Sequence, residues 1–218
     1  MTVTAVPAST SYTPGQQTCK TLISQIRAFL VAPDDPEVVT VALAGMNSGI
    51  ALINSRTWRK LYGEQDITLV SGTSDYGIAA DFKEPIRALL LDSSSVRQDR
   101  LEYLTNAEFY EAFSVGSTGS TPQYYTYNYK TRKIEFDVAP GTAFYPTLRL
   151  RYHKRIPKLT CTGTTGLPPE FDEFLVARGA SWLAMVRNRA MVRDLKIEAN
   201  ERWRDLVSDD MENRTDFS

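Results

Sequence analysis

The 218-residue sequence is poor in the side chains that build metal sites and disulfide frameworks. It has only two cysteines, Cys19 and Cys161, and a single histidine, His153. Two thiols cannot form a disulfide framework or a cysteine-rich zinc site, and we expect them to be free in a reducing compartment. A metal site would then depend on carboxylates, and no Asp or Glu cluster has ligand spacing. The sequence therefore predicts no metal and no cofactor.

A charge excess and a long apolar run are also missing. Lys and Arg number 25 against 26 Asp and Glu, which gives a formal net charge of −1. This balance argues against a protein built mainly to coat nucleic acid. No window approaches the roughly 20 apolar residues of a membrane helix, and the N-terminus lacks the pattern of a signal peptide. We expect a soluble protein made in a cytoplasm, with no membrane partner.

Motifs for catalysis are absent as well. Ser117 lies in "VGSTGS", which lacks the Gly-x-Ser-x-Gly pattern of a nucleophile elbow. His153 has no identifiable acid partner, and neither a phosphate loop nor a dinucleotide-binding fingerprint occurs. The sequence predicts a protein that is not an enzyme.

A helical pattern is present near both ends of the chain. Residues 1–14 are small, polar and proline-containing, which is typical of a flexible arm. Residues 15–63 predict two helices. Asp34 or Asp35 can cap the second one, with Pro36 at its first position.

The second helix is marked by one apolar stripe, which consists of Val39, Leu43, Met46, Ile50 and Ile53. The stripe predicts a helix that runs to about Leu61 and stops at Gly63. Gly45 and Gly49 lie inside it at four-residue spacing and would permit close approach of another helix.

Residues 168–204 predict one long helix or two consecutive helices, which would complete a bundle with the N-terminal ones. Acidic residues dominate from Asp205 onward, and residues 205–218 predict an acidic C-terminal tail. This tail either frays or orders on a partner through sparse apolar anchors. The candidate anchors are Trp203, Val207, Met211 and Phe217.

The middle of the chain, residues 64–167, has the period-two pattern of strands. Thr105 and Glu108 fit a capping box for one short helix at about 101–114. Strict alternation over 124–138 and 147–154 predicts a half-buried antiparallel meander. The predicted fold class is α+β: a helical bundle from the N- and C-terminal helices with an inserted antiparallel β-rich domain.

The predicted strands also concentrate tyrosines and cations. From Lys130 to Lys158, eight Lys or Arg side chains stand against Glu135 and Asp137, a local excess of six positive charges. The favoured interpretation is a sheet with one packed aromatic face and one wet basic face. The alternative is a single-stranded nucleic-acid-binding module in which bases stack on the tyrosines. The candidate basic face consists of Lys130, Arg132, Lys133, Arg149, Arg151 and Lys154.

Four segments of the sequence, in order, carry a resemblance to a known family: "DYGIAADFKEPIRALLL", "LEYLTNAEFYEAF", "PQYYTYNYKTRKIEFDVAPGTAFYPTLRLRYHKRIPKLT" and "LPPEFDEFLVARGASWLA". Together they resemble the head–tail adaptor (connector) proteins of tailed bacteriophages, also called tail accessory factors or tail tubular protein A-like proteins. The likeness covers roughly residues 16–189. "APGTAFYP" departs from it, because the family has a more regular proline-containing turn there.

This resemblance implies a structural virion protein of the neck, between capsid and tail. It implies a helical bundle that bears a β-rich domain, assembled in the host cytoplasm as a homo-oligomeric ring of about twelve copies. The implied partners are the portal protein, a tail tube or nozzle protein, other copies of the chain, and genomic DNA that passes the channel non-specifically during ejection. The anchors named above become a candidate portal-binding tail. The basic face becomes a candidate channel or inter-subunit face, with the acidic tail as its complement.

Overall fold

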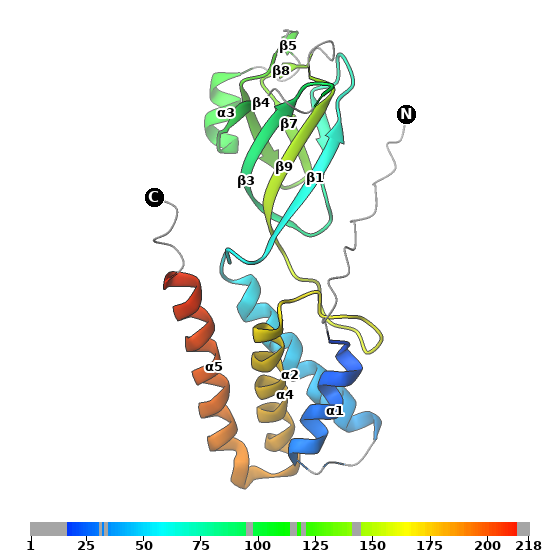
Figure 1. Ribbon diagram of the computed structural model, residues 1–218, viewed down its shortest axis with the longest axis vertical. Coiled ribbons are helices and arrows are strands. Elements are labelled where there is room, and N and C mark those ends of the chain that lie inside the picture. The colour runs from blue at the N-terminus through cyan, green and yellow to red at the C-terminus, as the bar shows by residue number, and fades with distance from the viewer. Residues whose placement is uncertain are drawn as a thin grey trace. The chain divides into compact units, whose positions relative to one another are not determined.

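The computed structural model describes residues 17–212, with gaps at 31, 33–34, 95–97, 114–116, 119–120 and 141–144. The predicted N-terminal arm and residues 213–218 lie outside the described residues. The described chain divides into two compact units, of which one is 62–155 and the other combines 17–61 with 156–212. Helices and strands both contribute (Figure 1), so the predicted mixed α+β class is confirmed.

The helical unit consists of α1 (Cys19–Leu30), α2 (Pro36–Asn54), α4 (Pro169–Arg187), η1 (Arg189–Met191) and α5 (Val192–Glu212). Helix α4 is central, because α1, α2 and α5 all pack against it. The predicted C-terminal helical segment forms two helices, α4 and α5, separated by the short 3-10 helix η1 that follows Asn188. The core of the unit includes Leu22, Ile26, Met46, Ile50, Trp58, Phe171, Phe174, Leu175 and Leu183.

Local signals set the two ends of α2. Asp35 is the N-cap, since its carboxylate accepts the backbone N–H of Val38 at 2.9 Å, and Pro36 follows as predicted. The helix ends at Asn54, earlier than the predicted end near residue 61. Beyond it, the indole N–H of Trp58 donates to the Ile53 carbonyl at 2.7 Å. The chain therefore folds back over the helix end, because this buries the indole in the core.

Glycines let α2 approach α4 closely. A Cβ on Gly45 would lie only 2.8 Å from the Trp182 Cβ and 2.9 Å from the Gly179 Cα. A Cβ on Gly49 would lie 2.8 Å from a methyl of Leu175. The predicted close approach at Gly45 and Gly49 is confirmed, and it explains why the helix tolerates their low propensity.

By length and composition alone, α2 could cross a membrane, with a mean hydropathy of 1.4 over its best window. The expectation that no stretch would approach this range was therefore wrong. In this fold Met46, Ile50 and Ile53 of α2 are buried in the helical core, as in a core helix of comparable composition.

The β unit, within the described residues, contains a seven-stranded sheet in the order β1-β9-β3-β4-β6-β7-β2. All neighbours are antiparallel except β4 and β6. The strands are β1 (Tyr62–Thr68), β2 (Asp75–Gly77), β3 (Phe82–Leu91), β4 (Gln98–Tyr103), β6 (Tyr124–Asn128), β7 (Lys133–Phe136) and β9 (Thr147–Lys154), with β5 (Ser117–Thr118) and β8 (Val138–Ala139) paired separately.

Side-chain hydrogen bonds link the two edge regions of this sheet. The Tyr76 hydroxyl donates to the Val70 carbonyl at 3.0 Å and accepts the Val70 N–H at 2.9 Å. Gln65 on β1 accepts the backbone N–H of Ala79, just past β2, at 2.8 Å. The sheet is therefore a nearly closed barrel (Figure 1), since these bonds satisfy edge groups that would otherwise be open.

The predicted three-stranded meander is wrong. β6 and β7 do form a hairpin, with Tyr127 opposite Ile134. However, β9 lies between β1 and β3, and the second neighbour of β7 is β2. Alternation shows that a strand has one buried face, here with Leu148 and Leu150 in the barrel interior, but it does not show which strand lies beside it.

The short helix α3 (Asn106–Ala112) begins later than predicted, because β4 continues to Tyr103. The predicted capping box is confirmed. Thr105 Oγ1 accepts the Glu108 N–H at 3.4 Å, and the Glu108 carboxylate accepts the Thr105 N–H at 3.0 Å.

Candidate functional site

Acids on neighbouring strands neutralise part of the candidate basic face. Arg149 Nε lies 2.8 Å from Asp66 Oδ1, and this partner lowers the pKa of Asp66. Arg151 Nε lies 2.9 Å from Glu64 Oε1. Both acids come from β1, directly opposite their partners in the register. Exposed pairs of this kind add little stability, but they neutralise two of the three Lys and Arg side chains of β9.

The other candidate cations lie mostly around the β6–β7 turn. The Lys133 side chain pairs with Asp75 of β2. Lys130 and Arg132 lie in the turn itself, where the guanidinium of Arg132 donates to the Ala80 carbonyl at 2.7 Å. Lys154 is half-buried at the end of β9. The six side chains therefore do not make one continuous, unpaired basic surface.

Two of the three tyrosines of β6 belong to the barrel interior. Tyr125 and Tyr127 are 2% and 4% exposed, and burial raises the pKa of Tyr125. The ring of Tyr127 lies 4.5 Å from that of Phe82, between centroids. Tyr129, by contrast, is 59% exposed and packs edge-on against Tyr127. In this fold the two buried rings cannot stack on bases.

Two of the candidate C-terminal anchors pack into the core of the helical unit itself. The ring centroid of Trp203 lies 5.4 Å from that of Trp58 and 5.2 Å from that of Phe174. Val207 packs against the same core. Met211 is 50% exposed, and Phe217 lies outside the described residues. Met211 is thus the described anchor with the most surface left for a partner.

Residues 205–212 of the predicted tail are helical, since α5 runs to Glu212. Buried Asp210 accepts the backbone N–H of Arg59 at 2.9 Å, and Lys60 Nζ lies 2.6 Å from Asp209 Oδ2. These contacts hold the end of α5 against the segment that follows α2. Asp209 and Asp210, which resemble tail residues in the sequence, therefore have partners far away along the chain.

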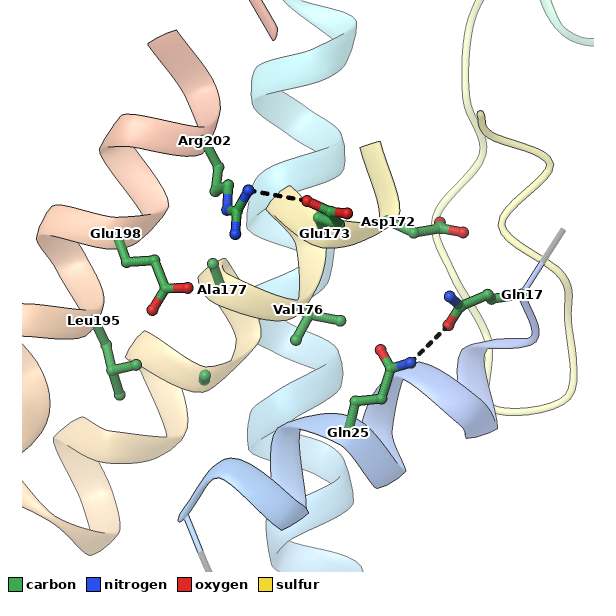
Figure 2. A pocket seen from close by; sticks show the side chains of 10 residues that line it. Gln17, Gln25, Asp172, Glu173, Val176, Ala177, Leu195, Glu198 and Arg202 are labelled. Carbon is green, nitrogen blue, oxygen red and sulfur yellow. Dashed lines mark hydrogen bonds and ion pairs between the residues drawn. The ribbon is translucent and has the colours of Figure 1, made fainter. Parts of the chain in front are cut away.

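A groove of about 300 Å³ crosses α4 between α1 and α5 (Figure 2). Its apolar lining is small, consisting of Val176, Ala177 and Ala180 from α4 with Leu195 from α5. Its polar lining consists of Gln17 beside α1, Gln25, Asp172, Glu173, Glu198 and Arg202. A mixed, concave surface of this kind is suited to receive a side chain of another molecule.

Asp172 is the unusual group in this groove, because its side chain is buried without a clear partner. It is 1% exposed, and neither carboxylate oxygen has a hydrogen bond of ordinary geometry in the described part of the chain. Burial raises its pKa from 3.8 to about 6, and repulsion from Glu170 adds to the rise. The Thr165 hydroxyl and the backbone of Gln17 act in the opposite direction. The sequence analysis did not single out Asp172, since an acid in the first turn of a helix is common.

The remaining polar groups of the groove leave it acidic. Arg202 Nη1 lies 3.0 Å from Glu173 Oε2, and the Gln25 amide donates to Gln17 Oε1 at 3.1 Å (Figure 2). With Asp172 and Glu198, three carboxylates stand against the one guanidinium of Arg202.

The described residues offer little support for metal binding or for thiol chemistry. They contain no group of three or more His, Cys, Asp and Glu side chains that could hold a metal ion. Cys19 is buried and Cys161 exposed, and both are free thiols. Burial, with a smaller contribution from Cys161, raises the pKa of Cys19 to about 11.

Comparison with known proteins decides the family. Residues 17–216 match the family described as SU10 adaptor protein. This chain belongs to that family. The predicted kinship with the head–tail adaptors of bacteriophages is thereby confirmed. As an SU10 adaptor, the chain is a structural protein of a phage virion with a head–tail connector role.

The chain also has a weaker likeness among solved structures. It is similar to a chain of the "Neck of empty GTA particle computed with C6 symmetry", at 12% identity and a TM-score of 0.27. That match covers 83% of this chain and 81% of the other chain. No curated protein matches the sequence.

The Asp172 side chain gives the stability of this protein a testable pH dependence. Because its folded pKa is raised from 3.8 to about 6, the folded state binds the proton more tightly than the unfolded chain in that window. The stability it contributes is present below the unfolded pKa and is lost as the pH rises through the folded one. We expect Asp172→Asn to raise the free energy of unfolding at pH 7.5 by about 1–3 kcal/mol and to change it little at pH 4.

Urea unfolding of both proteins at the two pH values measures this difference. Asp210→Asn is the matched control, because Asp210 is also buried but accepts the Arg59 N–H. The control should destabilise the protein at pH 7.5. Equal stability of wild type and Asp172→Asn at pH 7.5 would contradict the assignment of a buried, poorly partnered carboxylate.

Proposed function

We propose that this adaptor forms a homo-oligomeric ring of about twelve copies that docks under the portal. The ring extends the DNA channel, and its free side is the platform for the tail tube or nozzle. It is built in the host cytoplasm and acts without catalysis. The observation that carries the proposal is the family match over residues 17–216, which spans both compact units.

The order of the chain supports the finer architecture. The β unit, 62–155, lies in the sequence between the two segments that make the helical unit. We propose that it is a domain inserted into a helical bundle, so that each copy can offer a helical surface and a β surface to different partners.

The outer face of the barrel suits a channel through which DNA passes without being held. In the register, Arg151 has Glu64 of β1 on one side and Arg87 of β3 on the other. Glu64 offsets one of these two cations, and tight binding of nucleic acid needs a larger basic excess. A single-strand-binding module is correspondingly less supported, because the tyrosines that would stack on bases, Tyr125 and Tyr127, are buried.

The C-terminal region is the candidate portal contact. Trp203 and Val207 have partners in the core of the helical unit, which leaves Met211 and Phe217 as the anchors for a portal. In this proposal α5 presents the end of the chain, and the residues beyond it complete the contact.

Complementation in vitro tests the proposed function. A phage that carries a deletion of this gene should accumulate heads that lack tails. We expect addition of the purified protein, followed by tails, to restore tailed particles and infectivity by electron microscopy and plaque count. Heads that remain tailless with the protein in excess would contradict the proposal.

A further inference from the structure

The carboxylates that line the groove between α1 and α5 outnumber its cationic side chains. Asp172 is 1% exposed and lacks a hydrogen bond of ordinary geometry within the described residues, and Glu198 adds a second carboxylate. Arg202 lies 3.0 Å from Glu173 and is therefore already paired. The Thr165 hydroxyl and the Gln17 backbone, which interact with Asp172, are both neutral, so the carboxylate has no counter-ion among the described residues. A cation that enters the groove would supply one.

The chain itself carries suitable cations at the junction of α4 and α5. Arg189, Arg193 and Lys196, which we call the basic corner, are exposed. None of them forms an ion pair with a described residue. Nearby, Val186 and Ile197 are 53% and 46% exposed, so the corner combines charge with apolar surface.

Arg193 of the basic corner points away from the groove of its own chain. Leu195 and Glu198 line the groove from α5. Arg193 lies roughly 160° around the helix from Leu195, at about 100° per residue, so it points to the opposite side. Insertion of Arg193 into a groove would therefore take place between two copies, which is a head-to-tail contact of two unlike surfaces.

We propose that the groove between α1 and α5 binds a guanidinium or ammonium group from the basic corner of a second copy. This proposal rests on the proposed ring, and it names the two surfaces that join neighbouring copies. Head-to-tail pairing of unlike surfaces closes a ring when the rotation between copies is right. Small lining residues, Ala177 and Ala180, leave space for the stem of a long cationic side chain.

A charge exchange tests the pairing. We expect Glu198→Lys and Arg193→Glu each to weaken ring formation by about tenfold or more, measured by mass photometry on portal rings at low salt. The double variant should recover ring formation to within about threefold of wild type. Glu201→Lys, an exposed position of α5 outside the groove, is the matched control and should assemble normally. Normal assembly of both single variants, or no recovery in the double variant, would overturn the proposal.

A second measurement examines the groove without any portal. N-acetylarginine amide should shift the NMR signals of Val176 and Ala177 in the isolated protein, and Asp172→Asn or Glu198→Gln should weaken this binding by about tenfold. No shift at those residues would overturn the groove as a cation site. If the arginine probe binds but the protein ignores the portal, the proposed ring function fails while the cation site stands.

Discussion

Gly45→Val is expected to destabilise the helical unit by about 3 kcal/mol. The atoms in the way are the Cβ of Trp182 and the Cα of Gly179, at 2.8 and 2.9 Å from a Cβ placed on Gly45. Both are fixed by the backbone of α4, so that no rotamer change can make room. The two helices would have to move apart, which would loosen a seam that includes Met46. Urea unfolding followed by circular dichroism measures the loss.

Ala44→Val is the matched control, since Ala44 is the exposed neighbour of Gly45 on α2. That substitution adds the same branched side chain and should cost about 0.5 kcal/mol through helix propensity. If Gly45→Val were no more harmful than Ala44→Val, the close approach of α2 and α4 would be wrong.

Trp203→Ala is expected to lower the free energy of unfolding by about 3 kcal/mol. This value is near the low end of the range for removal of a buried aromatic side chain, because the indole is only half-buried. The side chain lies against Trp58 and Phe174, and its removal leaves a cavity between α5 and the core. We expect α5 to lose protection from hydrogen exchange before the rest of the helical unit does.

Met211→Ala is the contrasting variant, because Met211 is 50% exposed. It should change the stability of the isolated protein by less than about 0.5 kcal/mol, and its effect should emerge in binding to the portal. If Trp203→Ala left stability unchanged and impaired only portal binding, the indole would be a binding anchor and not a core residue.

Features governed by neighbours in the sequence were predictable. Both helix caps form as expected, because each depends on residues only three positions apart. Asp35 accepts the Val38 N–H, and Thr105 forms a capping box with Glu108. The strands around Tyr125, Ile134 and Leu150 follow from alternation. The expectation that they would be half-buried was wrong for β6 and β7, because Thr126 and Glu135 are buried as well.

Features that depend on distant parts of the chain were not predictable from pattern. β9 lies between β1 and β3, so Arg149 meets Asp66 rather than standing on an open basic face. Helix α2 ends earlier than predicted because the chain folds back and the Trp58 indole donates to the Ile53 carbonyl. In each case a partner far along the sequence, or the burial of one large side chain, overrides the local signal.

The groove likewise could not be predicted from local sequence pattern. Its side chains come from α1, α4 and α5, and Asp172 has no local signal that separates it from an ordinary acid at a helix start. The family was nevertheless within reach of the sequence, because several weak segments in the right order carry more information than any one of them.

The mass of this adaptor in solution, alone and with the portal ring encoded by the same genome, tests the central claim most directly. We predict that mixing with portal yields one discrete complex whose added mass corresponds to a full ring of adaptor copies. A protein that keeps its own mass in the presence of portal, yet shifts when a single-stranded oligonucleotide is added, would contradict the adaptor function and favour nucleic-acid binding.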